Sequence, residues 1–359
     1  MCEGFFTADM TLGEVRRTFR KLLADSVNPF VRQTPALDAD VIICHFGGFS
    51  RTHLLTHEDE QISFFLAEEL SLALGQRLSG LPVAYITNEK EFYGRPFYVD
   101  QNVLIPKPDT ELLVELAVAD ARRRMFEKQQ VPSLQPASSE SSRPLQQTAL
   151  RIADICTGSS CIAISLLLEL TGGQGDGSRR TAASMQPSFP SFVHSEAAQK
   201  TPGFAGPSMA LDVVATDLSR DALDVADKNV GKLVPDALRA RISLLEGDLC
   251  VPLNDGALFD IIVSNPPYVP ASVTDELLSD GRGEPRLALD GGSDGLAIIR
   301  RLGPQVFSHL VPGGSFFLET GEYNAEAAAA YLESVGFTDV RIHKDLSGQL
   351  RVTEARRPL

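Results

Sequence analysis

Apolar and polar positions repeat with a helical period over the first part of the chain. Thr11 is followed three residues later by Glu14, a capping-box pattern that opens a helix, and apolar residues then recur at helical spacing. Similar patterns predict helices over 38–46 and 59–78. We therefore expect residues 1–85 to form a separate, small all-helical domain.

The pattern changes near residue 150, where short apolar runs alternate with amphipathic segments. Strands are predicted at 150–155, 211–215, 242–245, 259–263 and 315–319 and near 338–343 and 349–354, and helices at 161–170, 219–232, 295–309 and 324–335. Strands that alternate with helices are typical of a parallel α/β sheet. We therefore expect an α/β fold with a mostly parallel sheet and helices on both faces.

Other segments connect and interrupt these two parts. Residues 86–105 carry aromatic and β-branched residues around Gly94, which predicts a β-hairpin linker. The α/β domain would then span residues 106–359. Within it, about 127–148 is rich in Gln, Ser and Pro and about 172–208 in Gly, Ser, Pro and Ala, and we expect both to be low-complexity insertions.

Composition and charge exclude several classes of function. The formal net charge is −14, so general affinity for nucleic acid phosphates is not expected. No apolar run approaches the roughly 18 residues that span a membrane, and the N-terminus lacks the pattern of a signal or transit peptide. The five cysteines have no metal-ligand spacing, which favours reduced thiols in a cytoplasm. His53 and His57 could share a helix face, but no third ligand accompanies them, so no metal site is expected.

A candidate substrate site follows the predicted strand 259–263. Ser264-Asn265-Pro266-Pro267-Tyr268 ends that strand abruptly, because each proline removes a backbone donor and fixes φ. Asn265 precedes a proline and is therefore biased toward an extended conformation. The stiff loop offers a carboxamide, proline carbonyls without competing N–H groups, and the face of Tyr268. This set suits a planar NH2 group, which needs two acceptors and a flat surface.

A candidate cofactor site lies after the first strand of the predicted sheet. The turn consists of Cys156, Thr157, Gly158, Ser159 and Ser160. It lacks the full Gly-x-Gly-x-x-Gly pattern of dinucleotide binding, and the carboxylate of Asp154 at the mouth of the strand would repel a pyrophosphate. The same carboxylate would suit an ammonium or sulfonium group. We therefore expect S-adenosylmethionine (SAM) rather than a nicotinamide dinucleotide.

Acidic residues at the next two strand ends extend this site. Asp217 lies 59 positions after Gly158, or 22 without the 37-residue segment 172–208, close to the usual offset of about 20 for an acid that binds ribose hydroxyls. Asp248 and Leu249 end the third strand and would border the adenine. Ligands of open α/β sheets bind beyond the carboxyl ends of the strands, where these residues are expected to meet.

Taken together, these segments resemble the release-factor glutamine methyltransferases, the PrmC/HemK family. Residues 106–111, Pro-Lys-Pro-Asp-Thr-Glu, are similar to the family's Pro-Arg-Pro-Glu-Thr-Glu signature, and residues 283–296 and 317–321 are similar to two later family segments. The resemblance covers nearly the whole chain and implies a Rossmann-like SAM-dependent methyltransferase sheet. The sequence departs from the family at Cys156 and Ser160, which replace the first and third glycines of the cofactor turn.

The resemblance also implies the reaction and its residues. The substrate would be the glutamine of the Gly-Gly-Gln loop in a bacterial-type peptide-chain release factor, methylated at its side-chain nitrogen with SAM as donor. Asn265, which would also border the cofactor, and the Pro266 carbonyl would each accept one N–H of that amide. Pro267 and Tyr268 would complete the substrate site. No base is needed before attack and no metal is required, and the N-terminal domain would recognise the release factor.

Two other functions share some of these features. An adenine-N6 methyltransferase acting on nucleic acid would use the same loop chemistry, but the net acidity and the N-terminal helical domain favour a protein substrate. A catalytically inactive SAM-fold binding protein would account for the altered cofactor turn. The intact loop around Asn265 argues against it.

Overall fold

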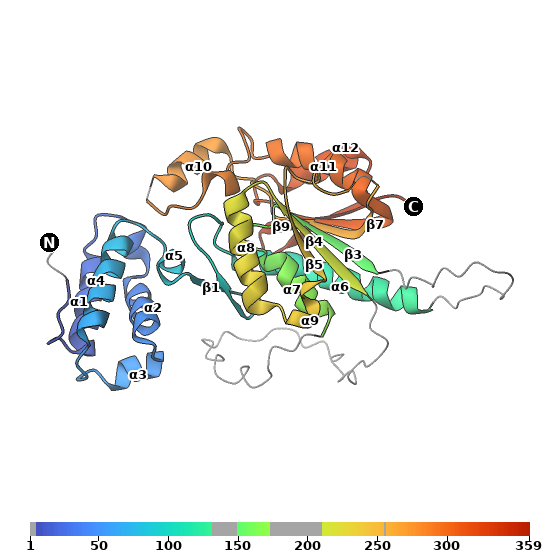
Figure 1. Cartoon of the computed structure of the whole chain (residues 1–359). Helices are drawn as coiled ribbons and strands as arrows, with labels where there is room; N and C mark the ends of the chain where they lie inside the picture. Colours follow the sequence, from blue (N-terminus) through green and yellow to red (C-terminus); the bar gives the residue numbers. More distant parts are fainter. Residues whose placement is uncertain (1–4, 131–148, 173–209, 255, 280) are drawn as a thin grey trace.

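A computed structural model describes residues 5–130, 149–172, 210–254, 256–279 and 281–359. The N-terminal helices lie beside the α/β part of the chain, with the hairpin between the two (Figure 1). Most of the two segments expected as insertions, 127–148 and 172–208, lies outside the described residues.

The N-terminal helices follow the predicted pattern with one difference. They are α1 (Leu12–Ala24), α2 (Pro35–Gly47), α3 (Arg51–Thr56), α4 (Phe64–Leu78) and α5 (Val83–Thr87), with a short 3-10 helix at Val31–Gln33. Thr11 and Glu14 form the expected capping box. The helix predicted over 59–78 begins only at Phe64, because the Ser63 side chain caps it there. Buried apolar side chains from all five helices form one core.

A seven-stranded sheet forms the centre of the α/β part (Figure 1). In the described part of the chain the strands are β1 (Glu89–Phe92), β2 (Arg95–Tyr98), β3 (Leu150–Ile155), β4 (Leu211–Asp217), β5 (Ile242–Glu246), β6 (Phe259–Ser264), β7 (Leu310–Glu319), β8 (Thr338–Lys344) and β9 (Leu350–Arg356). The sheet order is β5-β4-β3-β6-β7-β9-β8. The first five of these strands are parallel, and β9 runs antiparallel to both its neighbours. The predicted mostly parallel sheet is confirmed.

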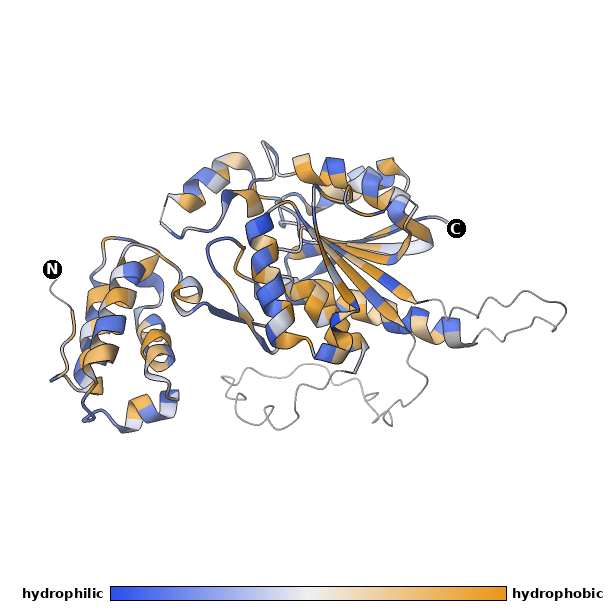
Figure 2. Cartoon of the chain, in the orientation of Figure 1, coloured by the Kyte–Doolittle hydropathy of each residue, from blue (hydrophilic) through white to orange (hydrophobic). Residues whose placement is uncertain are grey.

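Helices cover both faces of this sheet. Among the described residues they are α6 (Glu111–Gln130), α7 (Cys161–Leu170), α8 (Arg220–Leu233), α9 (Asp236–Arg239), α10 (Ala271–Leu278), α11 (Ala297–His309) and α12 (Ala325–Val335), with 3-10 helices at Pro108–Thr110 and Arg286–Ala288. Ile261 and Val263 of β6 pack with α6 and α7, whereas Ile262 between them packs with α11 and α12. Apolar residues therefore line the strands and the inner sides of the helices (Figure 2). None of the helices described is long and apolar enough to cross a membrane.

The hairpin β1–β2 ties the N-terminal helices to the sheet. Its Phe92 and Phe97 are buried in the core that α6 and α7 also line. Asn229 of α8 accepts a hydrogen bond from the Tyr98 N–H (2.7 Å) and donates to the carbonyls of Tyr98 and Ser159, each at 3.0 Å. One side chain thus links the hairpin to the turn that follows β3.

The strand order places a topological switch point at β3, which has β4 on one side and β6 on the other. In the strand register, the end of β3 is level with the ends of β4 and β6. Cys156, Asp217 and Asn265 stand at or just after these three ends. The fold therefore brings the candidate cofactor and substrate residues to one edge of the sheet, where α/β proteins bind ligands.

Candidate active site

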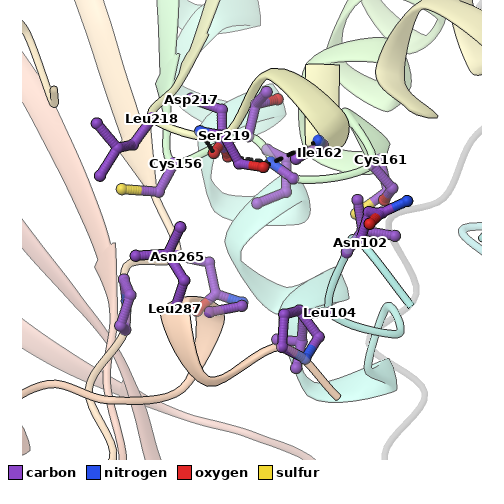
Figure 3. Close-up of a pocket in the computed structure, with 18 of the residues that line it drawn as sticks. Asn102, Leu104, Cys156, Cys161, Ile162, Asp217, Leu218, Ser219, Asn265 and Leu287 are labelled. Carbon is purple, nitrogen blue, oxygen red and sulfur yellow. Dashed lines mark hydrogen bonds between the residues drawn. The ribbon is translucent and has the colours of Figure 1, made fainter. Parts of the chain in front are cut away.

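A cavity of about 340 Å³ opens at this edge (Figure 3). That volume is in the range of small-molecule sites. Nine of the residues predicted for the site line it: Cys156, Thr157, Gly158, Ser159, Asp217, Asp248, Leu249, Asn265 and Pro267. Four others, Asp154, Ser160, Pro266 and Tyr268, are absent from its lining in the described part of the chain. The predicted cofactor turn and the predicted substrate loop therefore face one shared space.

The turn after β3 keeps the backbone that glycines would give it. Cys156, Gly158 and Ser160 all have left-handed φ angles, of 63°, 53° and 62°. The left-handed conformation costs a non-glycine residue about 1–2 kcal/mol, so both replacements for glycine are strained. Burial raises the pKa of the Cys156 thiol far above its usual range. This thiol therefore stays protonated and forms a small, neutral part of the wall.

Asp154 lies beneath the turn rather than at the cavity surface. It is fully buried, and its Oδ2 accepts hydrogen bonds from the Thr157 hydroxyl (2.6 Å) and from the Ala163 N–H (3.2 Å). Burial raises its pKa to about 7, although both hydrogen bonds lower it. The direct contact with an ammonium group that the sequence suggested is not seen in the cavity lining. Asp154 instead holds the turn against the first residues of α7.

Asp217 faces the cavity with both carboxylate oxygens held by the backbone. Its Oδ2 accepts from the Gly158 N–H (2.8 Å) and its Oδ1 from the Ser219 N–H (2.9 Å). Burial raises its pKa, while the backbone N–H groups of Ser219 and Gly158 act in the opposite direction. Each oxygen retains a lone pair for a further donor. The geometry leaves Asp217 able to accept hydrogen bonds from a diol in the cavity.

The end of β5 adds a charged pair and apolar walls. Asp248 forms an ion pair with Arg301 of α11, and both line the cavity. Leu249 has a positive φ of 55°, and its carbonyl accepts a hydrogen bond from the buried Thr216 hydroxyl at 2.9 Å. Ile298 is a further apolar wall. Such surfaces suit a flat heterocycle.

The loop after β6 is only partly arranged as predicted. Asn265 is half-buried, faces the cavity (Figure 3), and donates from Nδ2 to the Thr110 hydroxyl at 3.3 Å. Pro267 also lines the cavity, whereas Pro266 is buried outside its lining. The Tyr268 hydroxyl donates to Glu319 Oε1 at 3.2 Å. That hydrogen bond fixes the hydroxyl end of Tyr268 on the buried end of β7, outside the cavity.

Known proteins are similar to this chain over most of its length. Residues 14–87 match the family described as the PrmC N-terminal domain. The chain is 31% identical over 338 residues to the release factor glutamine methyltransferase of Moorella thermoacetica, covering 93% of this chain and 96% of that protein. It is 32% identical over 319 residues to the release factor glutamine methyltransferase of Bordetella pertussis, covering 89% of this chain and 94% of that protein. This chain belongs to the release factor glutamine methyltransferase family.

Solved structures resemble the chain less closely. A methyltransferase from Pyrococcus furiosus covers 75% of this chain and 92% of its own at 16% identity, with a TM-score of 0.40. This likeness is too distant to support an inference. Membership of a methyltransferase family itself implies SAM as the donor. The cavity fits that group, because it combines the start of α7, the Asp217 carboxylate and the apolar walls at Leu249 and Ile298.

Several residues that line the cavity were not predicted from the sequence. Leu104, Lys107 and Thr110 reach the cavity from the segment before α6, and Leu287 reaches it from the 3-10 helix at 286–288. Lys107 Nζ lies 2.7 Å from Glu284 Oε1, so the two segments are in contact beside the cavity. The similarity of residues 106–111 and 283–296 to family segments was the signal that could have placed them there.

His53 lies in α3 and His57 directly follows that helix. Their rings stack with centroids 4.1 Å apart, and His53 Nε2 lies 2.9 Å from the exposed Glu60. Among the described residues, no group of three or more potential ligands is placed to hold a metal ion.

Proposed function

We propose that this protein transfers the methyl group of SAM to the side-chain amide nitrogen of the glutamine in the Gly-Gly-Gln loop of peptide-chain release factors. The observation that carries the proposal is the single cavity lined by both the cofactor turn at 156–159 and the Asn265 loop. Membership of the release factor glutamine methyltransferase family supports it.

The chain's own residues supply alignment. An amide nitrogen is a weak nucleophile because its lone pair is delocalised, and the bound SAM supplies an electrophilic methyl group. The Asn265 side-chain oxygen would accept one N–H of the substrate amide. The Pro266 carbonyl would accept the other, which requires the loop to turn this carbonyl toward the cavity that Pro266 does not line. These two hydrogen bonds hold the nitrogen in line with the methyl group and stabilise the positive charge that develops on nitrogen. The proton leaves the methylated amide readily afterwards.

We propose that Asp217 binds the ribose hydroxyls and that Asp248 and Leu249 border the adenine. The turn at 156–160, including Thr157 and Ser159, would surround the methionine part of SAM. Asp154 then acts through the turn rather than by direct contact. These assignments rest on the lining of the cavity and on the hydrogen bonds of Asp217.

We further propose that residues 1–85 form a domain that recognises bacterial-type release factors, that 86–105 is its hairpin linker, and that 106–359 is the catalytic domain. Exposed apolar side chains on α4, including Phe65 and Leu72, would suit a protein partner. Release factors work in translation, so we expect the protein in the cytoplasm. The formal net charge of −14 disfavours direct binding to nucleic acid or to an anionic membrane surface.

The test is a transfer assay with tritium-labelled SAM. Three substrates are offered separately: a release factor, the same factor with its Gly-Gly-Gln glutamine changed to Ala, and duplex DNA. We expect label only in the first, on the glutamine nitrogen as located by mass spectrometry. Label in DNA would support adenine-N6 methylation instead. No label in any substrate despite SAM binding would indicate an inactive SAM-binding protein.

A further inference from the structure

A contact between the start of α12 and the end of the Asn265 loop has no part in the reaction described above. Asn324 directly precedes α12 and is 4% exposed. Its Nδ2 donates a hydrogen bond to the Tyr268 carbonyl at 2.9 Å. The hydroxyl of Tyr323, an exposed side chain, donates to the same carbonyl at 3.4 Å. Asn324 is therefore the buried and better-placed donor to this end of the loop.

The side chain of Asn324 does not cap the helix that it precedes. Asn is favoured at this position because its side-chain oxygen can accept from an N–H of the first turn. Asn324 makes no such hydrogen bond, and its backbone (φ −124°, ψ 2°) departs from the extended conformation that caps usually adopt. Its Oδ1 is buried and has no partner among the described residues. Capping of α12 therefore does not explain this residue, whereas the contact with the loop does.

Gly295 makes room for this contact. It has a positive φ of 75°, and a Cβ at this position would overlap the Tyr268 carbonyl oxygen and lie 2.7 Å from Asn324 Nδ2. A side chain on residue 295 would therefore push the donor and the acceptor apart. Gly295 belongs to the segment 283–296 that is similar to the family, so the similarity extends to the residue that permits the contact.

The stretch between this contact and Asn265 has few free torsions. Two prolines separate Asn265 from Tyr268, and their rings fix φ. Beyond Tyr268, the Val269 N–H donates to the Leu289 carbonyl at 2.9 Å, and the Val269 carbonyl accepts from the Gly291 N–H at 2.8 Å. At its other end the loop continues the buried strand β6. A displacement of Tyr268 is therefore passed on to Asn265 rather than absorbed within the loop.

We infer that Asn324 is a positioning residue, which holds the Tyr268 carbonyl and thereby sets the place of the Asn265 carboxamide in the cavity. The inference rests on the proposed function, in which Asn265 accepts an N–H of the methylated amide. A carbonyl can only accept, so holding it requires a donor such as Nδ2. The turn of the Pro266 carbonyl toward the cavity then takes place with this end of the loop held. A misplacement of about 1 Å can cost about 100-fold in rate.

The experiment compares the wild type with Asn324→Ser, Gly295→Ala and the control Tyr331→Phe. Ser is as favourable as Asn at the start of a helix, but its shorter side chain does not reach the Tyr268 carbonyl. Tyr331 lies on the same helix, and its hydroxyl donates to the Arg300 carbonyl at 2.7 Å. The control thus also loses one side-chain hydrogen bond to a carbonyl, but away from the loop. Measured are kcat, KM for release factor, SAM affinity by calorimetry, and urea unfolding.

The expected result is a selective loss of turnover. Asn324→Ser should lower kcat by about 10- to 100-fold, with KM for release factor and SAM affinity each within about twofold of the wild type. Gly295→Ala should show the same selective loss. Tyr331→Phe should keep near-normal kcat, although its free energy of unfolding should be similar to that of Asn324→Ser.

A near-normal kcat in Asn324→Ser, or an equal loss of kcat in Tyr331→Phe, would overturn the positioning role. A parallel loss of SAM affinity would also overturn it, because the side chain would then support the whole edge of the sheet. If Asn324→Ser does not fold, Gly295→Ala decides by the same comparison of kcat with SAM affinity. These outcomes leave the proposed function intact as long as the wild type methylates the release factor. Absence of methylation by the wild type would reject the proposed function and the inference together.

Discussion

At the scale of single residues, the proposed mechanism assigns the alignment of the substrate to Asn265. We predict that Asn265→Ala lowers kcat by about 10²- to 10³-fold, the usual cost of losing one preorganised hydrogen-bonding group in an active site. SAM affinity should change little, because the lost contact is made to the substrate amide. Steady-state kinetics and calorimetry test this, with Asn254→Ala as a control at an exposed position outside the cavity lining. A near-normal kcat would remove Asn265 from its role.

Asp217 should control cofactor affinity. We predict that Asp217→Asn weakens SAM binding by about 1.5–3 kcal/mol, because hydrogen bonds to a charged acceptor are worth that much. Asp217→Ala should weaken it further, since the N–H groups of Gly158 and Ser219 also lose their acceptor. Titration calorimetry measures both, and Asp224→Asn on the exposed face of α8 is the control. Unchanged affinity in Asp217→Asn would place the ribose contact elsewhere.

The strained turn predicts a stabilising substitution. Ser160 combines a left-handed φ with a buried hydroxyl that has no partner among the described residues. Ser160→Gly should raise the free energy of unfolding by about 1–2 kcal/mol by removing the left-handed penalty. Ser165→Gly is the matched control: its hydroxyl is also buried and unpaired, but it lies within α7. In the helix, glycine should lower the free energy of unfolding by about 0.5–1 kcal/mol. Urea denaturation of both variants distinguishes the expected gain at position 160 from the expected loss at position 165.

At the scale of elements, the sequence predicted the central strands well because their apolar runs are bounded by clear breakers. It placed the start of β7 at residue 315, five positions late. Pro312 and Gly313 look like a turn, yet Leu310 already pairs with Phe259 and the Gly313 N–H bonds to the Arg357 carbonyl. Backbone pairing with segments distant in the sequence therefore overrides the local turn pattern. α9 and α10 went unpredicted because each is a short helix that begins directly after a proline.

For the candidate site as well, local patterns could be predicted from the sequence, whereas contacts between distant elements could not. Cys156, Asp217 and Asn265 could be predicted to converge, because parallel strands in register bring their carboxyl ends to one edge. The burial of Asp154 and the hydrogen bond from Tyr268 to Glu319 could not. They depend on how side chains pack between elements distant in sequence, which periodicity does not specify.

The N-terminal helices permit a deletion test. Contacts to the rest of the chain include Arg282 over the Phe30 ring at 5.0 Å and the close approach of Gly281 to the Ser79 carbonyl. A chain that begins near Leu81 should keep SAM binding, because none of the described residues before Gln101 lines the cavity. It should have a lower kcat/KM for intact release factor. Equal kcat/KM from both chains would refute a recognition role for these helices.

At the scale of the whole molecule, two buried acids give stability a distinctive pH dependence. Burial raises the pKa of both Asp154 and Glu319 to about 7. Between about pH 4.5 and 7 the folded protein therefore holds protons that the unfolded chain has released, and the free energy of unfolding should fall as the pH rises through this window. For Glu319 alone the loss is on the order of 3 kcal/mol.

Glu319→Gln isolates that contribution. Without SAM, its advantage in unfolding free energy over the wild type should be larger at pH 8 than at pH 5, because a neutral carboxamide avoids burying a charge. Urea denaturation at both pH values measures the difference, and Glu322→Gln at an exposed position is the control. An equal effect of Glu319→Gln at pH 5 and pH 8 would contradict the raised pKa.

The two longest connections between described elements both precede a strand of the sheet. One runs from the end of α6 at Gln130 to the start of β3 at Leu150, and the other from the end of α7 at Leu170 to the start of β4 at Leu211. Both enter their strands at the amino end, on the opposite edge from the cavity. An engineer can use the same two points to graft a fluorescent reporter or an affinity handle onto a working enzyme.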